Sequence, residues 1–105
     1  MTKHSDPAVL EALDLAWDDE RGYLGLLRAG VFSEDLGNQY VELLGQIEIE
    51  EGERLHPDFV RLVWFAPLYT EWQQEGFADR GKDSSEMVKI GNLIRERLME
   101  ILGIP

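Results

Sequence analysis

The chain has 105 residues, contains no cysteine, and carries 21 acidic against 10 basic side chains, for a formal net charge of −11. The absence of cysteine excludes disulfides and thiolate-bound zinc. The negative charge argues against nucleic acid or an anionic membrane surface as a partner, because both are themselves anionic. The length fits one domain that buries its own core, and we expect residues 1–105 to form a single helical domain.

The N-terminal segment, residues 1–5, has no apolar run of the kind that a signal peptide contains, and we expect it to be a frayed tail. The longest apolar stretch covers residues 62–69. It is far shorter than the roughly 20 residues that a membrane-spanning helix needs. Both observations predict a soluble, cytoplasmic protein.

The first helix is predicted to begin at Asp6 and Pro7. An aspartate can accept a hydrogen bond from the free amides of a first turn, and proline has no amide to leave unpaired. Apolar side chains then recur at intervals of three and four, at Val9, Leu13, Ala16 and Trp17. Gly22 weakens this pattern, so residues 23–29 form either its continuation or a second short helix that ends at Gly30.

A further helix is predicted over residues 34–51, with Ser33 as its N-cap and Gly52 at its end. Its apolar face consists of Leu36, Tyr40, Leu43, Leu44 and Ile47. The alternation of apolar and polar residues over 46–50 also fits a short strand. The helix is favoured because the apolar face continues into this stretch without a turn signal.

The next element is predicted to open at His56 and Pro57 and to close at Gly76. Pro67 lies inside it, where proline removes one amide, frees the carbonyl of Val63 and bends the helix axis. One kinked helix or two shorter helices would both fit this pattern.

The last helix follows a polar loop over residues 77–83, with Asp83 or Ser84 as its cap and Gly103 as its stop. Its apolar period is the most regular in the chain: Met87, Ile90, Ile94, Leu98 and Ile101. We therefore expect an all-α fold, an antiparallel bundle of four to five helices whose third helix is kinked at Pro67.

Few residues could support catalysis. The four serines lie at or beside predicted helix starts, where capping explains them. His4 falls in the expected tail, and His56 precedes a proline at a helix start. Glu53 and His56 have the Glu-x-x-His spacing of di-iron bundles, but that chemistry needs two such pairs on facing helices. We expect no enzymatic activity, no metal and no cofactor.

Acidic side chains gather near the ends of the first two predicted helices. A carboxylate at a helix C-terminus opposes the helix dipole by roughly 0.3–1 kcal/mol, so a solubility surface would not require this placement. One interpretation is a patch for a basic partner; the other is neutralisation within the fold by Lys89, Arg95 and Arg97. The acids concerned are Asp18, Asp19, Glu20, Glu48, Glu50, Glu51 and Glu53.

The predicted third helix carries large apolar residues on two opposite faces. One face is sufficient for a core contact and includes Phe59, Leu62, Val63, Ala66 and Tyr69. The other bears Phe65, Leu68 and Trp72, with Arg61 among them and Trp64 on the flank. A helix that is apolar all round is normally buried all round. Either the other helices wrap this one, or its second face meets another molecule, since aromatic residues near an arginine are typical of association hot spots.

These features favour a protein-binding module that occludes or escorts a basic partner protein, with an immunity- or antitoxin-type inhibitor as the concrete form. The acids would speed encounter, and the second aromatic face would prolong binding. The first alternative is a self-associating, homodimeric accessory subunit whose partner is a second copy of the chain. The second alternative is a carboxylate-rich helical-bundle metal protein.

Overall fold

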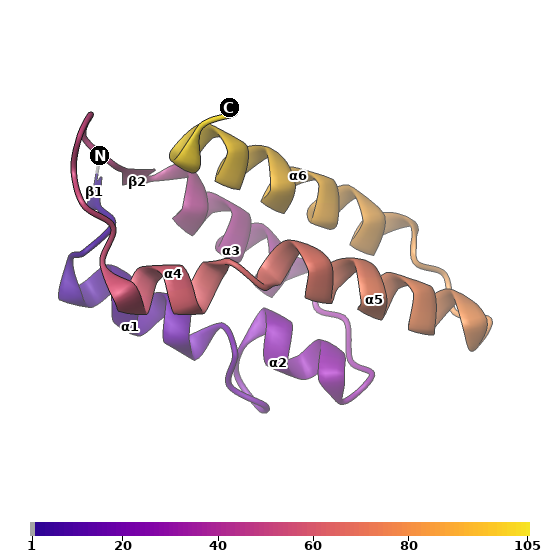
Figure 1. The fold of residues 1–105 in the computed structure, drawn as a ribbon. Coiled ribbons are helices and arrows are strands. Elements are labelled where there is room, and N and C mark those ends of the chain that lie inside the picture. Colours follow the sequence, from indigo (N-terminus) through magenta and orange to yellow (C-terminus); the bar gives the residue numbers. More distant parts are fainter. Residues whose placement is uncertain (1) are drawn as a thin grey trace.

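A computed structural model describes residues 2–105, which form six α-helices and one pair of two-residue strands (Figure 1). The helices are α1 (Pro7–Leu15), α2 (Tyr23–Arg28), α3 (Glu34–Gly45), α4 (Pro57–Val63), α5 (Ala66–Asp79) and α6 (Ser85–Leu102). The strands are β1 (Thr2–Lys3) and β2 (Ile47–Glu48). The predicted all-α class is confirmed, and the predicted helix number holds when α4 and α5 are counted as one interrupted helix.

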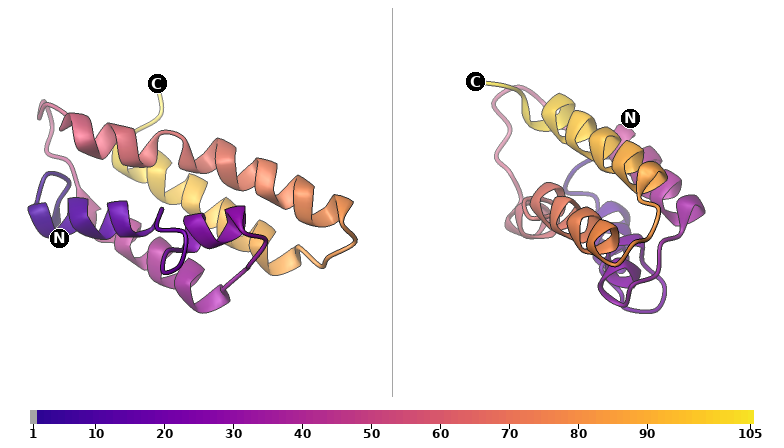
Figure 2. Two further views of the ribbon diagram at one scale, coloured as in Figure 1. Left: turned by 90° about the horizontal axis from the view of Figure 1, so that it is seen from below. Right: turned by 90° about the vertical axis from the view of Figure 1, so that its right-hand side faces the viewer.

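The helices pack around one shared core. α6 lies against α3 and α5, whereas α1 lies against α4 and α2 against α5 (Figures 1 and 2). α5 and α6 run antiparallel, joined by a short loop. Side chains from every helix are fully enclosed in this core: Leu13, Leu24, Leu27, Leu44, Phe59, Ala66 and Ile94.

Two helix starts have the predicted caps. The Asp6 carboxylate accepts a hydrogen bond from the Ala8 amide at 2.9 Å. The Ser33 hydroxyl accepts one from the Leu36 amide at 3.3 Å. Each cap satisfies an amide that has no partner within its own helix, so the local sequence determines where these helices begin.

The crossing of α3 with α6 depends on Gly37. A β-carbon at this position would lie 2.7 Å from Cδ1 of Ile90 and 2.8 Å from Cε1 of Tyr23. Only a residue without a side chain allows α3 to approach α6 and Tyr23 this closely.

The predicted helix over residues 34–51 is too long. α3 ends at Gly45, and Ile47–Glu48 forms β2, which pairs in parallel with β1. The Thr2 amide donates to the Gln46 carbonyl at 2.8 Å. The strand alternative is therefore correct, and its cause is a partner strand more than 40 residues away in the sequence.

The expectation of a frayed tail is wrong for residues 2–5, the part of that segment that the structure describes. His4 is fully buried. Its Nε2 accepts a hydrogen bond from the His56 amide at 3.0 Å, and its ring meets that of Phe59 edge-on at 5.0 Å between centroids. The segment thus joins the loop before α4 to the core.

The interruption near Pro67 divides the predicted third helix into two. α4 ends at Val63, and α5 begins at Ala66, so Pro67 lies in the first turn of α5. Proline is well tolerated there, because the first amides of a helix have no intrahelical partner. Within residues 2–105, no helix combines the length and the apolar composition that crossing a membrane requires.

Candidate functional site

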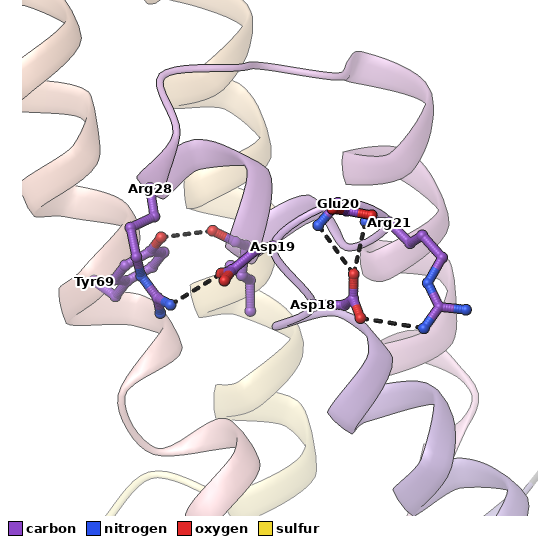
Figure 3. Close-up of polar contacts among 7 residues, drawn as sticks. Asp18, Asp19, Glu20, Arg21, Arg28 and Tyr69 are labelled. Carbon is purple, nitrogen blue, oxygen red and sulfur yellow. Dashed lines mark hydrogen bonds and ion pairs between the residues drawn. The ribbon is translucent and has the colours of Figure 1, made fainter.

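The loop between α1 and α2 holds the first acidic group, which we call the acidic loop (Asp18, Asp19 and Glu20). Oδ1 of Asp18 accepts hydrogen bonds from the amides of Glu20 at 2.9 Å and Arg21 at 3.0 Å, and Oδ2 lies 3.2 Å from Nη2 of Arg21 (Figure 3). The bond from the Glu20 amide, followed by that from the Arg21 side chain, lowers the pKa of Asp18. Asp18 therefore fixes the shape of the loop.

Asp19 connects the acidic loop to α5. Its carboxylate lies 3.2 Å from Nη1 of Arg28, whose guanidinium lies 5.7 Å from the centre of the Tyr69 ring (Figure 3). The Tyr69 hydroxyl donates in turn to the Leu24 carbonyl in α2. Burial raises the pKa of Tyr69, which keeps this hydroxyl a donor.

The second acidic group (Glu48, Glu50, Glu51 and Glu53) lies elsewhere. Glu53 lies 3.6 Å from Nδ1 of His4, just before α1 begins, whereas the acidic loop follows the end of α1. α1 has nine residues and is thus about 14 Å long. The two acidic groups therefore occupy opposite ends of this helix and do not form the single patch that the sequence suggested.

Neither acidic group lies at a helix C-terminus, so neither opposes a helix dipole as the sequence suggested. α1 ends at Leu15, so Asp18 precedes α2 rather than ending α1. α3 ends at Gly45, before Glu48. A helix dipole acts mainly within the last turn, and none of these carboxylates lies in one.

Neutralisation by α6 does not occur among the described residues. Lys89 and Arg97 pair with Glu86 and Glu100 one turn away on α6 itself, and Arg95 bonds to Asn92. The acidic loop is balanced instead by Arg21 and Arg28. In the part of the chain that the structure describes, three acids of the second group form no ion pair within 4.0 Å: Glu48, Glu50 and Glu51.

Three aromatic rings and a leucine at and after the α4–α5 junction form an exposed surface, which we call the aromatic shelf (Trp64, Phe65, Leu68 and Trp72). Phe65 lies at its centre, 5.3 Å from the ring of Trp64 and 5.5 Å from that of Trp72. Phe65 is half-buried, while Trp64 is 64 % exposed, Trp72 54 % and Leu68 41 %. The other helices therefore do not wrap this face.

Trp17 joins the shelf to the acidic loop, although the sequence pattern placed it in the core stripe of the first helix. Because α1 ends at Leu15, Trp17 lies in the following turn, half-buried. Its indole stacks on Phe65 at 6.3 Å and meets Tyr69 edge-on at 5.0 Å. Its Nε1 donates to the Leu62 carbonyl at 2.9 Å, which fixes the ring.

A hollow of about 340 Å³ lies between these features. Its walls include Trp17, Trp64 and Phe65, together with charged residues from three segments: Asp14, Arg28 and Arg61. Arg61 is exposed and lies 4.0 Å from Asp58. The structure thus brings Trp64, Phe65 and Arg61 together, and the Asp19–Arg28 pair joins the acidic loop to the wall of this hollow. Asp14 and Arg28 lie beside them without any local signal in the sequence.

The side chains considered for metal binding have other contacts. Glu53 accepts a hydrogen bond from the Glu50 amide at 3.0 Å, and Nδ1 of His56 caps α4 by accepting one from the Asp58 amide at 3.1 Å. Among the described residues, no three potential ligand side chains of histidine, aspartate or glutamate converge.

Comparison with known protein families, with curated proteins and with solved structures finds no match to this chain.

Proposed function

We propose that this protein is a binding module that occludes or escorts a basic partner protein, with an immunity- or antitoxin-type inhibitor as the concrete form. The observation that carries the proposal is the contact between the exposed aromatic shelf and the acidic loop through Trp17. An apolar anchor beside a carboxylate pair suits a partner segment that presents lysine or arginine next to an apolar side chain.

Asp19 and Glu20 are the contact groups of the acidic loop. The Asp19–Arg28 pair is exposed at both ends, 75 % and 57 %, and such a pair contributes about 1 kcal/mol or less. A cation of the partner can therefore replace Arg28 at little cost. Asp18 differs, because two backbone amides already hold its carboxylate. Its role is to position the loop.

The aromatic shelf supplies the anchor. Phe65 contacts the ring of Trp72, so this exposed indole, which is the anchor for the partner, is held in place before binding. Side chains that are ordered in advance lose little conformational entropy on association. Large aromatic side chains also bury more apolar area than any other residue type at an interface.

The second acidic group has a different role in this proposal. It lies near the N-terminal end of α1, away from the acidic loop, and is not part of the proposed contact surface. With the rest of the −11 charge, it attracts a basic protein over a longer range and raises the association rate. The proposed role needs no catalytic group, and the side chains of Ser33 and His56 act as helix caps.

The experiment is capture from native lysate on the immobilised protein, with mass spectrometry of what is retained. The variants are Trp72→Ser on the shelf and, as a matched control, Val31→Ser in the loop before α3, where Val31 is 48 % exposed. We expect a basic protein that the wild type and Val31→Ser retain, that Trp72→Ser loses, and that high salt releases. Equal retention by both variants would refute the proposal.

A further inference from the structure

A second apolar surface lies on the other side of Trp64. It is a groove of about 570 Å³ between the α4–α5 junction and the C-terminal half of α6. Its apolar lining consists of Val63, Trp64, Pro67, Leu98, Met99 and Leu102. Trp64, Met99 and Leu102 are exposed there. Contiguous exposed apolar side chains of this kind mark an interaction site.

We propose that this groove is the contact face between two copies of the chain. A two-fold dimer requires a surface that is complementary to itself. Trp64 forms a wall of the groove and is 64 % exposed, so a projecting ring lies directly beside a depression. When two such surfaces meet across a two-fold axis, the Trp64 ring of each copy covers the groove of the other.

The charge distribution favours this face over the rest of the surface. Two chains of net charge −11 repel each other and can meet only where the acid is sparse. The groove is lined by one base, Arg95, and one acid, Glu96, and is therefore locally neutral. Both acidic groups lie on other elements, in the α1–α2 loop and in the stretch from β2 to α4.

Arg95 and Glu96 also provide reciprocal pairing. Nη1 of Arg95 is buried and has no hydrogen-bond acceptor among the described residues, while Nη2 bonds to Asn92. In a two-fold dimer, the contact between Arg95 of one copy and Glu96 of the other occurs twice. Such a pair brings opposite charges together across the interface at the two residues that line the groove, although Nη1 itself stays enclosed within its own chain.

The first test is the mass in solution, measured by sedimentation or light scattering at rising micromolar concentration. We expect the mass to rise from the 12.0 kDa of one chain toward twice that value. Met99→Glu places a charge in the groove and should weaken dimerisation about thirty-fold or more. The matched control is Val88→Glu, which is exposed on α6 but outside the groove and should dimerise like the wild type.

The second test exchanges the charges of the proposed Arg95–Glu96 contacts between the two copies. Arg95→Glu alone and Glu96→Arg alone each create two repulsive contacts and should be monomeric, whereas an equal mixture of the two variants should form a heterodimer with both pairs restored. If Arg95→Glu does not fold, the single variant Glu96→Arg tests the pairing. In its dimer, Arg95 of one copy would face the arginine introduced in the other, and high salt should restore dimerisation by screening this repulsion.

A wild type that stays monomeric would overturn the inference. So would a dimer that survives both Met99→Glu and Glu96→Arg, or a basic protein that occupies the groove instead of a second copy. Trp72→Ser lies outside the groove and should leave the mass unchanged. The mass measurement therefore tests the dimer, whereas capture by Trp72→Ser tests the proposed partner binding.

Discussion

Replacing His4 by alanine should destabilise the protein by about 1.5–3.5 kcal/mol. The imidazole is fully buried, and its Nε2 accepts the hydrogen bond of the His56 amide at 3.0 Å. A partly buried amide left without an acceptor costs about 1–2 kcal/mol. Loss of the edge-on contact with Phe59 adds about 0.5–1.5 kcal/mol. For a domain whose total stability is about 5–15 kcal/mol, this loss is readily measured.

The assay is urea unfolding followed by circular dichroism, with two companion variants. His4→Gln keeps an amide oxygen that can accept from the His56 amide and should recover about 1 kcal/mol of the loss. Lys3→Ala alters the exposed neighbour in β1 and should stay within about 0.5 kcal/mol of the wild type. If His4→Ala were as stable as Lys3→Ala, the N-terminal segment would not be tied to the core as described.

Three further outcomes are expected. Burial raises the pKa of three tyrosines above the ordinary value of 10.0: Tyr23, Tyr40 and Tyr69. Absorbance titration should therefore find little tyrosinate until alkali unfolds the chain. Because these pKa values are higher in the folded than in the unfolded state, their contribution to stability is full below pH 10 and falls above it. The pKa of Asp18 in the folded state lies below its ordinary value of 3.8. The contribution of this carboxylate to folding stability is therefore present above pH 3.8 and is lost as the pH falls through the folded-state pKa. Over that acidic range, the melting temperature of Asp18→Asn should depend less on pH than that of the wild type. Gly37→Ala should lower the free energy of unfolding in urea by about 1–2 kcal/mol, since the crowding of its β-carbon exceeds the gain of about 1 kcal/mol in helix propensity. A variant more stable than the wild type would contradict the close helix crossing.

Local signals in the sequence were enough to predict most of the helices. The caps at Asp6 and Ser33 and the apolar period from Met87 to Ile101 depend on residues within one or two turns, and the structure has helices there. The error over residues 46–51 has a non-local cause. β2 exists because the N-terminal strand pairs with it, and no pattern within residues 46–51 identifies that partner.

The candidate site was predicted only in part, for a similar reason. The spacing of Phe65, Leu68 and Trp72 placed them on one helix face and left open whether the other helices cover it; in the structure Leu68 and Trp72 are exposed. Which acids lie beside that face depends on where α1 ends and on how α2 folds back onto α5, and both follow from tertiary packing. Trp17 was predicted to lie in the core stripe of the first helix, but it lies in the turn after α1 and lines the hollow. Its stacking on Phe65 places the acidic loop, which follows it in the sequence, next to the shelf.

The most direct test of the proposed function is the association rate with the captured basic partner, measured by stopped flow at several salt concentrations. The proposal predicts a rate that falls steeply with salt, and a smaller slope for the Asp19→Asn, Glu20→Gln double variant. It also predicts that Trp72→Ala dissociates faster while associating at nearly the wild-type rate. A rate independent of salt, or unchanged dissociation of Trp72→Ala, would contradict binding through the acidic loop and the aromatic shelf.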